Sequence, residues 1–317
     1  MTPDRYEAYS NRRQELSGII QKRGTKLSVS PWAAFVFGGL FVAVGTPIIL
    51  VGAKVLEINS ASVHAPYWVL TVAGATFVMG GFMPWGSAWK QAATHRQCLE
   101  ASRRYPNEPA LVDYPWHPDG FEVSEWPGVA KSFALAIGLT VFLSIFNWWA
   151  FAANGPRMVK GVVTVFDLIA AGTWWLAARQ LGRAFKFGHS RIEFPSFPCR
   201  LPGTVIVRWH PFGGINHVNK GTFTLRCVEE RMETRGVGNN QRVVLVHEQI
   251  GSTQGFFEQP RHFQLQEKVE LRYELPSDAQ PTRLAADKPI FWELEVKLDL
   301  PGLDFNEIYL VPVYSQT

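Results

Sequence analysis

Residues 33–53 read AAFVFGGLFVAVGTPIILVGA, a run without a single Asp, Glu, Lys or Arg. Three further stretches in the first 180 residues are alike in length and composition, and among them only the last contains a charged residue, Asp167: Tyr67–Trp89, Phe133–Ala152 and Gly161–Ala178. A helix needs roughly 20 mostly apolar residues to cross the hydrocarbon core of a bilayer. The four stretches therefore predict a multi-spanning membrane protein with four transmembrane helices.

Lysine and arginine are distributed unevenly around these stretches. Three segments are rich in them: the polar N-terminal residues, the connection between the second and third stretches, and the residues after the fourth. Only Lys54, Arg157 and Lys160 flank the opposite ends. Because an excess of Lys and Arg marks cytoplasmic loops, we expect a multi-pass protein of the inner (plasma) membrane with both termini in the cytoplasm.

The same pattern predicts three parts. Residues 1–30 form a cytoplasmic tail, residues 31–182 a four-helix transmembrane domain with a cytoplasmic loop at 90–130, and residues 188–317 a soluble domain large enough to enclose its own core. From Arg183 onward, 16 Lys and Arg are balanced by 16 Asp and Glu. A neutral domain lacks the basic surface that nucleic-acid binding requires. The expected partners are membrane lipids and a cytoplasmic or membrane protein.

Apolar and polar residues alternate one by one in the C-terminal part. Residues 292–300, WELEVKLDL, do so without a fault, and residues 205–209, 223–227 and 269–275 follow the same pattern. This is typical of half-buried antiparallel strands. Further strands are expected at 191–197, 242–250 and 306–314. The prediction is an α+β membrane protein in which four helices precede an antiparallel β-sandwich of the arrestin-like or immunoglobulin-like kind.

One carboxylate and one carboxamide lie inside the predicted spans. Asp167 is the only carboxylate there, about six residues from the outer end of its span, and Asn147 lies at a similar depth in the preceding span. A carboxylate in a membrane is costly, so it has a structural partner or a function. We expect an Asn147–Asp167 polar pair that joins two helices, with an ion or proton pathway as the alternative.

One stretch of the soluble half breaks the alternation with four consecutive apolar residues: Val243, Val244, Leu245 and Val246. It is expected to be a strand buried on both faces, or a protected edge strand that accepts a strand from a partner.

The sequence shows no strong catalytic or metal-binding motif. His210 and His217, with Cys199 or His189, lack the spacing of a metal tetrad, so no metal or cofactor is expected. Asp113, His117, Asp119 and Glu122 are the clustered titratable groups of the 90–130 loop. Glu229, Glu230 and Glu233 are interpreted as a solvated face, and the three cysteines, an odd number without CxxC spacing, as free thiols.

The C-terminal segments resemble a known family of folds. They read FPCRLPGTVIV (197–207), TLRCVEER (224–231), VELRYELP (269–276) and WELEVKLDLPGLDFNEIYLVPV (292–313). This order is similar to arrestin-like sandwiches, and with four spans it resembles bacterial membrane proteins of unknown function. In that group the loop tends to read P-x-E-P-W, whereas here Ala110 and Leu111 follow Pro109. The resemblance implies a sandwich that binds partners and carries no shared chemistry.

Three functions remain open at this point. The leading hypothesis is a non-enzymatic membrane protein that presents a cytoplasmic sandwich as an interaction or scaffolding module. The second is an accessory subunit of a transporter or channel that uses Asp167. The third is a membrane enzyme with its site at the cytoplasmic loop.

Overall fold

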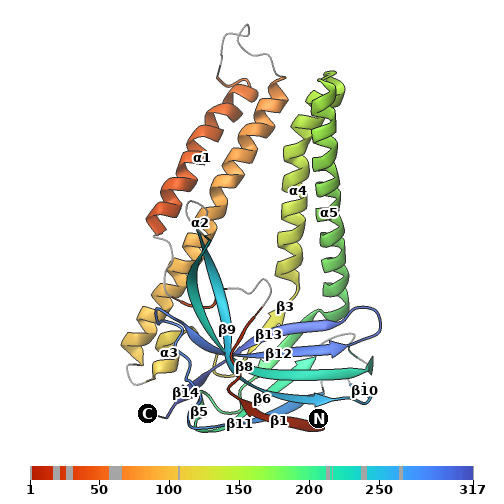
Figure 1. The fold of residues 1–317 in the computed structure, drawn as a ribbon. Coiled ribbons are helices and arrows are strands. Elements are labelled where there is room, and N and C mark those ends of the chain that lie inside the picture. The colour runs from red at the N-terminus through yellow and green to blue at the C-terminus, as the bar shows by residue number, and fades with distance from the viewer. Residues whose placement is uncertain are drawn as a thin grey trace. The chain divides into compact units, whose positions relative to one another are not determined.

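The computed structural model describes residues 2–16, 22–25, 31–56, 66–105, 108–211, 215, 217–236, 241–263 and 267–316. They fall into two compact units (Figure 1). The helical unit comprises Leu27–Ala93 and Glu125–Ala184, and the β unit comprises Met1–Lys26, Thr94–Ser124 and Phe185–Thr317. The chain is thus of the α+β class, with helices followed by antiparallel sheets.

Four helices carry the apolar stretches: α1 (Pro31–Gly52), α2 (Tyr67–Arg104), α4 (Trp126–Asn147) and α5 (Arg157–Phe187). A short π-helix, η2 (Trp148–Ala152), continues α4. All four are long and apolar enough to cross a membrane. Residues 90–104, expected in a loop, instead extend α2 as far as Arg104, because the first proline of this connection comes only at Pro106.

Glycines seven residues apart, Gly38 and Gly45 on α1 and Gly74 and Gly81 on α2, let the two helices pack closely. A Cβ atom added to Gly45 would lie 2.7 Å from the carbonyl oxygen of Gly74, and one added to Gly81 would lie 2.6 Å from that of Gly38. The backbones of the two helices are therefore in direct contact.

The same seven-residue spacing recurs among the buried residues of α4 with η2 and of α5. They are Val129, Ala136, Leu143 and Ala150 in the first, and Val163, Ala170, Ala177 and Ala184 in the second. A strict seven-residue repeat is typical of left-handed helix pairing.

The β unit contains two main antiparallel sheets. The first has the order β1 (Arg5–Ser10), β9 (Arg242–Phe257), β8 (Lys220–Arg235), β12 (Ile290–Asp299) and β13 (Phe305–Val311), with β2 (Gln14–Glu15) also paired to β9. The second has the order β11 (Val269–Leu275), β6 (Gly203–Pro211), β4 (His189–Glu193) and β3 (Phe121–Ser124). Two small sheets pair β10 (Arg261–His262) with β7 (His217–Val218), and β14 (Val313–Ser315) with β5 (Cys199–Leu201).

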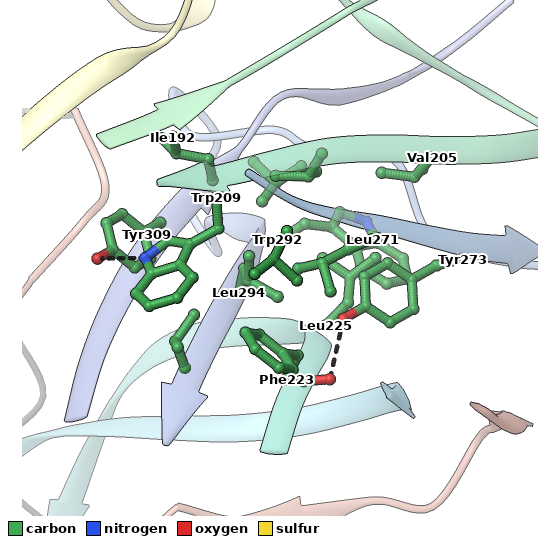
Figure 2. Close-up of a cluster of buried hydrophobic side chains, with 14 of the residues drawn as sticks. Ile192, Val205, Trp209, Phe223, Leu225, Leu271, Tyr273, Trp292, Leu294 and Tyr309 are labelled. Atoms are coloured by element: carbon green, nitrogen blue, oxygen red, sulfur yellow. Dashed lines mark hydrogen bonds between the residues drawn. The ribbon is translucent and has the colours of Figure 1, made fainter. Parts of the chain in front are cut away.

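The main sheets share one hydrophobic core, and Figure 2 shows its centre. Trp209 of β6 donates from Nε1 to the hydroxyl of Tyr309 on β13, and Tyr273 of β11 donates to the carbonyl of Phe223 on β8. Each bond joins one sheet to the other and gives a buried polar atom its partner. The residues predicted to face inward on β6, β8, β11 and β12 are buried, which confirms the alternation as a signal for these strands.

The β unit extends beyond the soluble domain expected over residues 188–317. Strands β1 and β2 precede the first helix and β3 precedes α4, yet all three pair within the main sheets. The sequence gives no signal for β1, because most of its side chains are exposed and it lacks an apolar alternation.

Candidate functional site

The β8–β9 hairpin extends beyond the rest of its sheet. Strand β12 pairs with β8 only as far as Glu229, whereas β8 and β9 remain paired as far as Arg235 and Arg242 (Figure 1). On the other side of β9, strand β2 pairs with Glu248 and Gln249, and Leu16 donates its backbone N–H to the carbonyl of His247. Within the described part of the chain, residues 242–246 have a β-partner on one side only.

This hairpin extension, residues 230–235 and 242–247, carries the four apolar residues singled out in the sequence. Val243 is 68% exposed, Val244 and Leu245 are half-buried, and only Val246 is buried. Met232, directly opposite Leu245, is 57% exposed. The expectation of a strand buried on both faces is therefore wrong for this stretch, because it projects past its neighbours.

A buried pair of side chains, Glu230 and His247, lies at the base of the extension. Glu230 and His247 face each other across the two strands, with Oε2 of Glu230 3.2 Å from Nε2 of His247. The backbone N–H of Arg23 donates to the same oxygen at 2.8 Å. Burial by itself raises the pKa of Glu230, but the hydrogen bonds from His247 and from the Arg23 and Gly24 backbone outweigh it, so the pKa is lowered. The expected solvated face is wrong at Glu230, which is 2% exposed.

The polar face of β12 is also buried. Arg226 of β8 donates from Nε to Glu293 at 2.6 Å and from Nη1 to Glu295 at 3.2 Å. Glu293 is fully buried and Glu295 almost so. Arg226 carries one positive charge between the two carboxylates, and the Nζ atom of Lys297, 2.9 Å from Oε2 of Glu295, supplies a second.

In the helical unit, the structure brings Asn147 and Asp167 together. Asn147 donates from Nδ2 to Oδ1 of Asp167 at 2.8 Å, and also to the carbonyl of Leu143 on its own helix. Both side chains are half-buried. The π-helix η2 begins at Trp148, directly after Asn147.

The four titratable residues of the 90–130 connection do not form one site. Asp113 accepts backbone N–H bonds from Leu284 and Ala285, both at 2.7 Å, and a third bond from the hydroxyl of Tyr314 at 3.0 Å. Burial and the Asp113 charge raise the pKa of Tyr314, so this hydroxyl stays a donor. Asp113 thus fastens the connection to the β unit.

The other three have separate surroundings. Glu122 lies 3.7 Å from Nδ1 of His189, and Asp119 is exposed. His117 lines a cleft of about 440 Å³ in the β unit, together with Arg23, Trp116 and Glu307. The cleft has room for a small molecule, but the two Asp residues and Glu122 are not among its lining residues.

The histidines and cysteines considered for a metal are also separated. His210 pairs with Glu193 at 3.0 Å, and burial lowers the pKa of His210 although Glu193 opposes this effect. Cys98, Cys199 and Cys227 are free thiols. The described residues contain no group of three or more metal-ligating side chains. His217 instead faces His262, a pairing that sequence spacing did not indicate because the two lie 45 residues apart.

Comparisons with known proteins add little to this picture. No protein-family model matches the chain, and no curated protein matches it. Among solved structures, the crystal structure of Spo0M, a sporulation control protein from Bacillus subtilis, matches with 14% sequence identity and a TM-score of 0.26. The match covers 40% of this chain and 49% of Spo0M, about half of that protein's length.

Proposed function

We propose that this protein is a multi-pass inner-membrane protein whose β unit, a sandwich of the arrestin-like kind on the cytoplasmic side, binds a partner protein. The four long apolar helices and the excess of Lys and Arg on one side of them support the membrane location and orientation. The two sheets around one core support the sandwich.

The observation that carries the binding proposal is that residues 242–246 have a β-partner on one side only, as far as the described residues go. Unpaired N–H and C=O groups along a strand edge are a template for another strand. Most proteins protect such an edge with charge, proline or a covering element. Here the apolar side chains of Val243 and Met232 are exposed to solvent close to this edge. An extended apolar segment of a partner would remove them from water while it pairs with the strand.

The proposed activity is binding and not catalysis. Asp113, the most buried acid of the connection's titratable cluster, accepts three structural hydrogen bonds, which leaves it poorly placed for proton transfer.

Site-specific photo-crosslinking in native membranes tests the binding proposal. A crosslinking residue at Val243 is expected to capture one protein, and the same residue at exposed Lys297 is the control. When the crosslinking residue is instead placed next to position 243, the substitution Val243→Lys should abolish the crosslink to the partner, because a lysine on a strand edge opposes pairing. Val243→Thr, which keeps the branched shape, should retain it. Equal capture by the Val243→Lys variant and the wild type would reject strand addition at this edge.

Cysteine labelling of intact cells tests the orientation. In a background with Cys98, Cys199 and Cys227 replaced by Ser, a cysteine at Lys54 should react with an impermeant reagent and one at Asn219 should not. The opposite pattern would reverse the orientation.

A second candidate function is that of an accessory subunit in transport. The Asn147–Asp167 pair favours it, because a carboxylate in a span is costly and π-helical turns are frequent at functional sites.

A further inference from the structure

Two histidines face each other on the small sheet of β7 and β10. The strands are antiparallel, with His217 directly opposite His262 and Val218 opposite Arg261. Residues directly opposite each other in an antiparallel pair project from the same face. Nδ1 of His217 lies 3.4 Å from Nε2 of His262, and the ring centroids are 4.7 Å apart.

This separation matches the distance between two nitrogens bound to one metal ion. Zn–N bonds measure about 2.0–2.1 Å, so two imidazole nitrogens at a tetrahedral angle lie roughly 3.4 Å apart. The two rings are inclined at 52°.

The surroundings of the pair suit a cation. His262 is exposed and His217 half-buried, so water can complete the coordination sphere. Neighbouring residues of a strand point to opposite faces. The residue before His262, Arg261, contacts the Asp4 carboxylate and donates to the Thr2 carbonyl. Its guanidinium also lies over the ring of Phe257, 4.8 Å from the centroid.

We propose that His217 and His262 form a surface site for a divalent transition-metal ion. Imidazole is a good ligand for Zn²⁺, Ni²⁺ and Cu²⁺, and Cu²⁺ is expected to bind most tightly. The ion would join the two ends of the β8–β9 hairpin: His217 precedes the start of β8 by three residues, and His262 follows the end of β9 by five. A bound ion thus links the start of β8 to the end of β9. This site is independent of the proposed partner binding.

Calorimetric titration of the full-length protein in detergent tests the site, with any histidine tag removed and trace metal stripped by a chelator. Zn²⁺ and Cu²⁺ should each bind with one ion per chain. His217→Ala and His262→Ala should each weaken metal binding by roughly tenfold or more. Two linked ligands bind an ion far more tightly than a single ligand does. His189→Ala removes another exposed imidazole, which is near Glu122, and should leave binding unchanged.

Electron paramagnetic resonance of the Cu²⁺-loaded wild type gives a second readout that does not depend on the folding of a variant. Two imidazole nitrogens should couple to the copper in the wild type and one in each single variant. Equal metal binding by the wild type and the double variant would overturn the proposal. So would a copper spectrum without imidazole nitrogen, or no binding by the wild type.

Discussion

Asp167 shows how a single polar residue constrains two helices. Its carboxylate accepts a hydrogen bond from Asn147 on the neighbouring helix. The sequence could pair these residues because their depth follows from the rise of a straight helix, 1.5 Å per residue. Substitution separates a structural role of this pair from a functional one.

Asp167→Asn should leave expression and thermal stability in detergent nearly unchanged, because an amide oxygen still accepts from Asn147. Asp167→Leu should cost about 1–2 kcal/mol of stability, the range measured for hydrogen bonds between membrane helices. The measurement is unfolding of the purified protein, with Thr164→Val on the same helix as control. A transport defect in well-expressed Asp167→Asn protein would instead favour the accessory-subunit function.

Glu230 gives the β unit a defined pH dependence. Its folded-state pKa is lowered, so the folded protein keeps this carboxylate charged at a pH where the unfolded chain, with a value near about 4.3, takes up a proton. The stabilisation is therefore complete above about pH 5 and is lost as the pH falls through the folded-state value.

Unfolding of the β unit between pH 7 and pH 3 checks this expectation. Glu230→Gln should be less stable than the wild type at pH 7 and should lose less stability on acidification. Glu258→Gln, at an exposed glutamate, is the control and should follow the wild type. Parallel pH curves for the wild type and Glu230→Gln would contradict the prediction.

The burial of Glu230 was not predictable from its own strand. The alternation there places Glu230 on a polar face, and a polar face is normally solvated. What covers it is the segment around Arg23 and Gly24, more than 200 residues earlier in the chain. Local patterns cannot detect a contact of that kind.

At the scale of elements, the α1–α2 pair depends on the absence of side chains at a few positions. Gly45→Ala should destabilise the pair by about 1–3 kcal/mol, because the added methyl group meets the Gly74 carbonyl and Val78 at under 3 Å. Gly80→Ala is the matched control on α2, where an added Cβ has nothing within 4 Å. It should be neutral or stabilise by up to about 1 kcal/mol, since alanine favours helix.

Thermal unfolding of the two variants in the same detergent provides the measurement. A loss of stability in Gly80→Ala equal to that in Gly45→Ala would indicate that glycine content, and not helix contact, determines the effect.

Some elements are specified by their own residues and could be predicted, whereas others depend on partners far along the chain and could not. The four helices were predictable from the length of their uncharged apolar runs. The strands β6, β8, β11 and β12 were predictable because apolar periodicity specifies their buried faces. Strands β1, β2 and β3 were not, because their place in the sheets comes from partners far along the chain. The exposure of Val243 was missed for the same reason, since an apolar run cannot report where neighbouring strands end.

At the scale of the whole molecule, the β unit should require its N-terminal strands. Tyr6 packs edge-on against Tyr273, Tyr9 packs against Trp292, and Thr253 donates to the carbonyl of Glu7. Deletion of residues 2–16 should cost about 2–4 kcal/mol, the scale of two aromatic side chains and a buried hydrogen bond.

Tryptophan fluorescence during denaturant unfolding is the readout for the deletion. The Tyr6→Ser, Tyr9→Ser double variant, which keeps the chain length, should reproduce most of the loss. Unchanged stability after the deletion would show that residues 188–317 fold without β1, as the sequence alone suggested.

Strand β1 pairs with β9, which the ribosome makes much later, and this delay affects folding during synthesis. Arg5 pairs with Phe256, so the ribosome must add about 250 residues, including all four long helices, before the first strand finds its neighbour. At rates of roughly 5–20 residues per second, that delay is on the order of 10–50 s. During it, the nascent N-terminus is a strand without a sheet. On crowded polysomes it can reach β9 of another copy whose own β1 has not yet paired, so we expect strand exchange between chains to be a route of misassembly.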